Sequence, residues 1–86
     1  MVLIIYSTAV CPKSRKLKEY LQANGFEFET RDMQDWLPFL RAQNVTTINA
    51  PVFQVGDKFY IHADIFIGNQ LNESFIQKLI DDQPSD

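Results

Sequence analysis

A single cysteine, Cys11, stands where an expected strand runs into an expected helix. An unbroken apolar run over residues 2–6 precedes it, and a helical pattern follows from about Pro12 to Ala23. The first turn of a helix carries unpaired backbone N–H groups and the positive end of the helix dipole, and both stabilise an anion. A thiol at that position, next to Lys13, ionises more readily than a free cysteine. The sequence therefore predicts a reactive thiolate at Cys11.

Two neighbours of the cysteine fit this chemistry. Pro12 suits the first helical position, where the missing N–H removes a donor that has no partner in any case. Ser14 is placed to donate a hydrogen bond from its hydroxyl to the thiolate, which lowers the thiol pKa further. The alternatives are that Cys11 is a small buried hydrophobe and that Ser14 is an ordinary serine of an early helical turn. The polar, basic setting of the turn favours the reactive thiol.

The composition indicates one small folded domain over residues 1–83, followed by a frayed acidic tail at 84–86. Hydrophobic residues make up 45% of the 86 residues, which is enough for a modest core. The net charge of −3 argues against a general nucleic-acid binder, and no apolar run is long enough to span a membrane. One cysteine cannot form an internal disulfide, so we expect a reducing compartment, the cytoplasm. We also expect a monomer.

The elements around the cysteine follow from hydrophobic periodicity and from turn residues. Continuous apolarity in the first strand predicts burial on both of its faces. Residues 62–71 are the least readable stretch and are expected to extend a hairpin or to form an irregular loop. The expected strands are 2–6, 26–30, 52–55 and 58–61, and the expected helices are 12–23, 32–44 and 72–81. This order, β-α-β-α-β-β-α, is that of an α/β domain whose first two strands run parallel.

Two short motifs resemble the glutaredoxins. The first is Tyr6-Ser7 at the end of a strand, followed by Cys-Pro-x-Ser at a helix start. The second, residues 50–53, reads Ala-Pro-Val-Phe and is similar to a family segment whose proline is cis and lies against the active-site cysteine. The resemblance implies a thioredoxin-like (glutaredoxin) fold, with a mixed four-stranded sheet and helices on both faces. Without it, a trans Pro51 at the start of an edge strand is the ordinary expectation.

The resemblance also implies an activity. Ser14 occupies the place of the second cysteine of dithiol members, so the chain resembles the monothiol type. Cys11 then attacks a glutathionylated protein or a small disulfide, and a second glutathione releases the resulting mixed disulfide. Glutathione is a co-substrate in this scheme, and its partners are glutathionylated or disulfide-bearing proteins. A cis Pro51 leaves the backbone N–H and C=O of Ala50 facing a bound peptide or glutathione.

The chain departs from the family in the residues that hold glutathione. Thr8 stands where many members have a lysine, and residues 61–64 lack the Gly-Gly of the family. Lys13 or Arg15 is a candidate replacement for one carboxylate contact. Free N–H groups at the start of the last helix, near Glu73 and Ser74, are a candidate for another.

Two other functions are compatible with these residues. One is a binding module that has lost redox cycling and recognises a peptide or a protein. The other is a carrier in which Cys11 and glutathione ligate a [2Fe–2S] cluster between two subunits. No resident metal is expected, because His62 has no second nitrogen or sulfur ligand in view.

Overall fold

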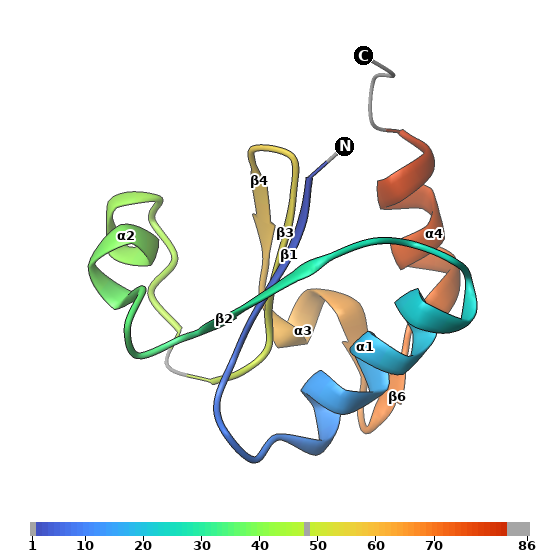
Figure 1. Cartoon of the computed structure of the whole chain (residues 1–86), viewed down its shortest axis with the longest axis horizontal. Helices are drawn as coiled ribbons and strands as arrows, with labels where there is room; N and C mark the ends of the chain where they lie inside the picture. Colours follow the sequence, from blue (N-terminus) through green and yellow to red (C-terminus); the bar gives the residue numbers. More distant parts are fainter. Residues whose placement is uncertain (1, 48, 83–86) are drawn as a thin grey trace.

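A mixed four-stranded sheet forms the centre of the structure, a computed structural model that describes residues 2–47 and 49–82 (Figure 1). The strands lie in the order β2-β1-β3-β4. β1 pairs in parallel with β2 and antiparallel with β3, and β3 pairs antiparallel with β4. The parallel first pair confirms the prediction. The strand bounds are Leu3–Ser7 for β1, Glu29–Asp32 for β2, Val52–Val55 for β3 and Lys58–Tyr60 for β4.

Four helices and one small hairpin complete the described chain. The helices are α1 at Pro12–Ala23, α2 at Leu37–Ala42, α3 at His62–Ile65 and α4 at Glu73–Asp81. The hairpin consists of β5 at Phe66–Ile67 and β6 at Gln70–Leu71. No described helix has the length and apolarity needed to cross a bilayer.

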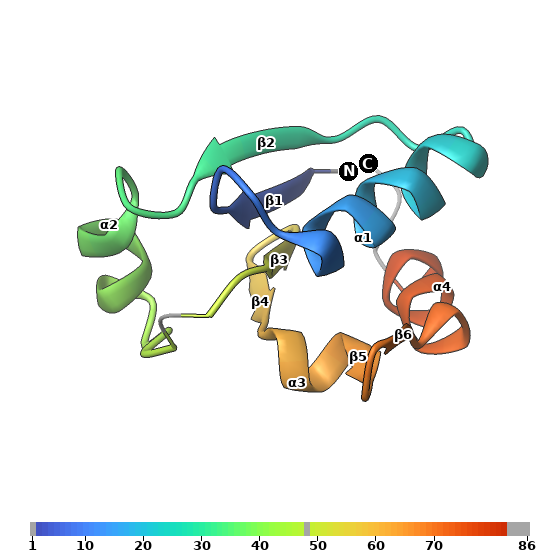
Figure 2. The same cartoon turned by 90° about the horizontal axis from the view of Figure 1, so that it is seen from below.

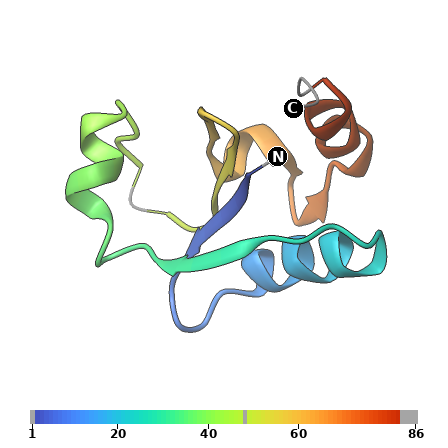
Figure 3. The ribbon, with the colours of Figure 1, turned by 45° about the horizontal axis from the view of Figure 1, so that its top comes forward.

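The sheet is covered on both faces, as expected from the unbroken apolarity of β1. Leu3 and Ile5 belong to a core cluster shared with α1 and α4, whereas Ile4 and Tyr6 belong to a second cluster shared with α2. Figures 2 and 3 show α2 on one side of the strands and α1 and α4 on the other. All five residues of β1 are buried. β1 is therefore a central strand of the sheet, and its two faces contact the helices on opposite sides.

The second strand and the second helix both begin later than predicted. The strand covers residues 29–32 rather than 26–30, because Phe26 and Phe28 pack against the α1–α4 cluster before the pairing with β1 begins. The helix covers 37–42 rather than 32–44. Asp32 still belongs to β2, and its carboxylate accepts a hydrogen bond from the Gln34 N–H at 2.8 Å in a turn. Asn44 adopts a left-handed conformation, with a φ of 64°, just after the helix.

The prediction for residues 62–71 was wrong. They neither extend the β3–β4 hairpin nor form an irregular loop, but fold as α3 followed by the β5–β6 hairpin. Gly68 supplies the positive φ of 62° at the turn of that hairpin. The last helix agrees with the prediction: Asn72 is its N-cap, and the Asn72 Oδ1 accepts from the Phe75 N–H at 3.4 Å. The predicted acidic tail at 84–86 lies outside the described residues.

Candidate functional site

Cys11 is the N-cap residue of α1. Its backbone is extended, with φ −147° and ψ 104°, and its carbonyl accepts the first helical hydrogen bond, from the Arg15 N–H at 3.1 Å. Pro12 takes the first helical position, as predicted. The loop from Thr8 to Val10 that joins β1 to Cys11 is exposed, and the Cys11 side chain is partly exposed. The sulfur therefore lies at an accessible strand-to-helix junction and not in the core.

The setting lowers the pKa of the Cys11 thiol. Partial burial is the largest single influence and raises the pKa, since it removes water from the charged form. The Ser14 hydroxyl and the backbone N–H groups of Ser14 and Lys13 are donors available to the ionised sulfur and lower the pKa, and so does the charge of Lys13. Together these contacts outweigh burial, so the thiolate is favoured relative to an ordinary cysteine.

Ser14 is the most deeply placed polar group of the site. It is only 2% exposed. Its hydroxyl lies close to the Cys11 sulfur, but among the described residues it makes no hydrogen bond of ordinary geometry. A neutral thiol is a weak acceptor and a thiolate is a strong one. We therefore assign the lowering of the thiol pKa to a hydrogen bond that the Ser14 hydroxyl forms once the sulfur is ionised.

The peptide bond between Ala50 and Pro51 is cis, as the resemblance implied. Pro51 is buried and directly precedes β3. Because β1 and β3 are antiparallel, with Tyr6 opposite Val52, the start of β3 lies at the same edge of the sheet as the end of β1. The topology thus brings Pro51 and the Cys11 loop to one edge.

The start of α3 reaches this same edge, which sequence reasoning did not foresee. Tyr60 lies opposite Phe53 in the β3–β4 pair, so Ile61 and His62 follow at the end of the sheet where β3 begins. The Ile61 N–H donates to Asp64 Oδ2 at 3.0 Å and caps α3. His62 Nδ1 is buried and has no hydrogen-bond partner among the described residues. A helix of four residues is too short to leave a periodic signal in the sequence.

The β5–β6 hairpin holds two of the lysines that follow Cys11. Lys13 Nζ lies 5.6 Å from the centre of the Phe66 ring, a cation–π contact. Lys16 Nζ donates to the Asn69 carbonyl at 2.6 Å. These contacts join the first turns of α1 to the β5–β6 hairpin, which the sequence did not predict, and they hold Lys13 near the site.

Glu73 and Ser74, the other predicted glutathione contacts, lie away from this edge. The start of α4 packs beside Tyr20, whose hydroxyl donates to Gln77 Oε1 at 3.1 Å. Tyr20 lies more than two turns along α1 from Cys11, or about 13 Å at 1.5 Å per residue. The Ser74 hydroxyl donates to Asn72 Oδ1 at 3.1 Å. The structure therefore gathers Cys11, Ser14, Lys13 and Pro51 at one end of α1, and places Glu73 and Ser74 near the other.

No family model, curated protein or solved structure matches the chain. Within residues 2–47 and 49–82 there is also no group of three or more His, Cys, Asp or Glu side chains that is placed to hold a metal ion.

Proposed function

We propose that this protein has a thioredoxin-like, glutaredoxin type of fold and catalyses glutathione-dependent thiol–disulfide exchange through Cys11. The observation that carries the proposal is the position of Cys11: it caps α1, is partly exposed, and has a thiol pKa below its ordinary value. Thiol–disulfide exchange needs an accessible thiolate. The mixed sheet and the cis Ala50–Pro51 bond at the same edge support the proposed fold and the resemblance to the monothiol glutaredoxins.

In the proposed reaction, the Cys11 thiolate attacks the glutathione sulfur of a glutathionylated protein. A bond forms between Cys11 Sγ and that sulfur, the original disulfide breaks, and the protein leaves as a thiolate that takes a proton from water. The thiolate of a second glutathione then attacks the mixed disulfide. This step releases oxidised glutathione and restores the Cys11 thiolate. The helix N–H groups and the Ser14 hydroxyl stabilise the negative charge on Cys11 before the first step and after the second.

The test is the intact mass of the protein after treatment with oxidised glutathione, followed as a function of pH. We expect one glutathione adduct, located on Cys11 and removed by reduced glutathione. Its rate of formation should follow a single ionisation with a pKa below that of a free thiol. The Cys11→Ser variant should form no adduct and serves as the blank.

A peptide-binding module without redox cycling is the second candidate. The separation of the α4 start from Cys11 favours it, since Glu73 and Ser74 do not complete one compact glutathione site with Cys11. Slow adduct formation, with the pH dependence of an ordinary or raised thiol pKa, would contradict the exchange reaction and support this candidate. Visible absorbance of the purified protein would instead point to a bound [2Fe–2S] cluster.

A further inference from the structure

A polar hollow lies beside the loop that carries Cys11. It is an open, shallow depression of about 240 Å³ between the end of β1, the strand β2 and the helix α1. Its lining includes Thr8, Lys18, Thr30 and Asp32, and Ala9 is the only lining residue without a polar side chain. A hollow of this size and lining suits a small polar group and not an apolar side chain.

The hollow is within reach of a substrate bound at Cys11. Ala9 lines it, and Cys11 follows two residues later, so the two Cα atoms are at most about 7 Å apart. Lys18 comes seven residues after Cys11, which places it on the same side of α1 about 10 Å along the helix. A disulfide whose sulfur meets Cys11 can therefore extend a short charged arm into the hollow.

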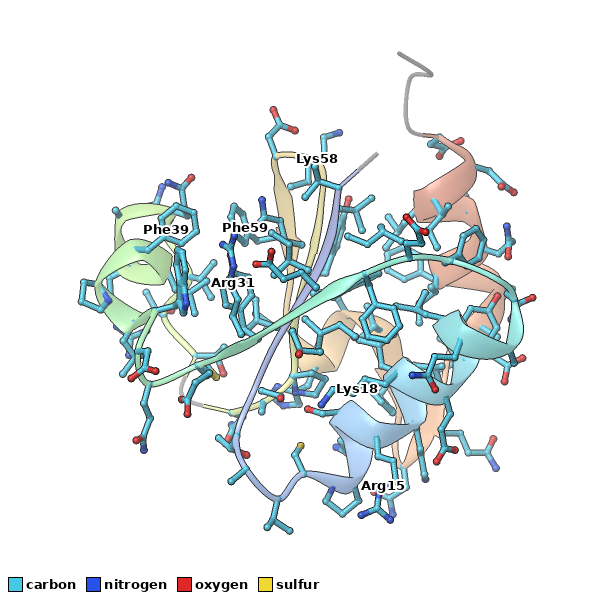
Figure 4. The ribbon with its side chains drawn as sticks, viewed as in Figure 1. Arg15, Lys18, Arg31, Phe39, Lys58 and Phe59 are labelled. Atoms are coloured by element: carbon cyan, nitrogen blue, oxygen red, sulfur yellow. The ribbon has the colours of Figure 1, made fainter. Side chains whose placement is uncertain are left out.

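Lys18 is the residue of α1 that lines this hollow. Its side chain is half-buried, and among the described residues it has neither a hydrogen bond nor an ion pair. Lys13 and Lys16, by contrast, are engaged by the β5–β6 hairpin. Figure 4 shows Lys18 on the side of α1 that faces the sheet, whereas Arg15 projects outward from the same helix.

Two other charged residues border the hollow, and neither neutralises Lys18. The Arg31 guanidinium is directed to the other face of the sheet, where it stacks over Trp36 at 3.9 Å and pairs with Glu29. The Asp32 carboxylate accepts from the Gln34 N–H and forms no ion pair with Lys18. The Lys18 ammonium and the two threonine hydroxyls are the donors for one carboxylate, and the Asp32 carboxylate, which accepts from the Gln34 N–H, is the one negative charge of the lining.

We propose that Lys18 selects disulfides that carry a carboxylate near the reacting sulfur. This inference rests on the proposed function and specifies the class of its substrates. The exchange itself is unchanged: the Cys11 thiolate bonds to one sulfur of the disulfide, and the other sulfur leaves as a thiolate. Lys18 touches the carboxylate and not the reacting sulfur, so it acts on selectivity.

The test compares three small disulfides that differ in charge: anionic dithiodiglycolate, neutral 2-hydroxyethyl disulfide and cationic cystamine. Rate constants with Cys11 are measured at low salt and divided by those of a free cysteine peptide, which removes the intrinsic reactivity of each disulfide. We expect the anionic disulfide to react fastest and the cationic one slowest. Lys18→Gln should lower the ratio of the anionic to the neutral rate by about fivefold, and salt should lower it in the unsubstituted protein.

Two variants separate a specific contact from a general electrostatic field. Lys16→Gln removes a charge nearer to Cys11 but outside the hollow, and it should change the ratio less than about twofold. Lys18→Arg should retain the preference. An unchanged ratio in Lys18→Gln, or an equal loss in Lys16→Gln, overturns the assignment to Lys18. Failure of all three disulfides to react with Cys11 overturns both this inference and the proposed function, whereas equal normalised rates overturn this inference alone.

Discussion

Ser14 is almost completely buried, and its hydroxyl has no hydrogen-bond partner among the described residues while Cys11 is neutral. A buried hydroxyl without a partner costs about 1–3 kcal/mol of stability. Ionisation of Cys11 supplies an acceptor for that hydroxyl, so the two residues depend on each other. At the scale of single residues, the Ser14 hydroxyl and the helix dipole therefore both stabilise the Cys11 thiolate.

We predict that Ser14→Ala raises the pKa of the Cys11 thiol and slows its alkylation by iodoacetamide near neutral pH by roughly threefold to tenfold. The reason is the loss of the hydroxyl that donates to the thiolate. The pH dependence of the alkylation rate measures the effect, and a thermal melt shows that the variant is folded.

Ser74→Ala is the matched control for this substitution. Ser74 is also a serine in the first turn of a helix, but it is exposed and donates to Asn72. The control should leave the Cys11 alkylation rate unchanged. If Ser14→Ala has the alkylation profile of the unsubstituted protein, the Ser14 hydroxyl has no part in the ionisation of Cys11.

At the scale of elements, α2 is joined to the sheet through large side chains. Tyr6 of β1 contacts Trp36 and Phe39 with ring centres 6.2 and 6.4 Å apart, and Phe39 lies 6.0 Å from Phe59 of β4. Figure 4 shows Phe39, Phe59 and Arg31 together between α2 and the strands. Arg31 stacks on Trp36 and donates to the Tyr6 hydroxyl at 3.1 Å. The guanidinium thus connects β2, β1 and the start of α2.

We predict that Arg31→Lys lowers the free energy of unfolding by about 1 kcal/mol, because an ammonium cannot both stack on Trp36 and keep the planar hydrogen-bond geometry. Urea unfolding followed by Trp36 fluorescence measures the change. Arg15→Lys, an exchange of the same type at an exposed position of α1, should be neutral. Equal unfolding midpoints for Arg31→Lys and the unsubstituted protein would show that the stack contributes nothing to stability.

At the scale of the whole molecule, one edge of the sheet collects the ends of several elements. The end of β1, the start of β3 and the start of α3 meet there, and the Cys11 loop connects this edge to α1. The ionisation of Cys11 is therefore coupled to the folding of the entire chain, because only the folded chain brings Ser14 and the helix N–H groups to the sulfur.

We predict that this coupling makes stability depend on pH. The pKa of the Cys11 thiol is lower in the folded chain than in the unfolded one, so the folded chain loses this proton first as the pH rises. The stabilisation by the thiolate is absent below the folded pKa, grows as the pH rises above it, and is complete above the ordinary thiol value near 9.0. The difference in urea midpoint between the unsubstituted protein and Cys11→Ala should therefore increase across this window. A constant or falling difference contradicts the prediction.

The features that are local along the chain could be predicted from the sequence. The apolar run of β1, the start of α1 at Cys11 and Pro12, the β3–β4 hairpin and the Asn72 cap of α4 all follow from neighbouring residues. Hydrophobic periodicity, helix caps and turns depend on a few neighbouring residues, so they can be recognised in the sequence without knowledge of the fold.

Which of these features lie together depends on the tertiary structure. In the structure β2 begins at Glu29, because Phe26 and Phe28 pack against the α1–α4 cluster and residues from Glu29 onward pair with β1. The tertiary structure placed Glu73 beside Tyr20 and left Lys18 at the hollow next to Cys11. It also folded residues 62–71 into elements that are too short to have a period of their own. These outcomes depend on contacts between residues far apart in the chain, and no local pattern encodes such contacts.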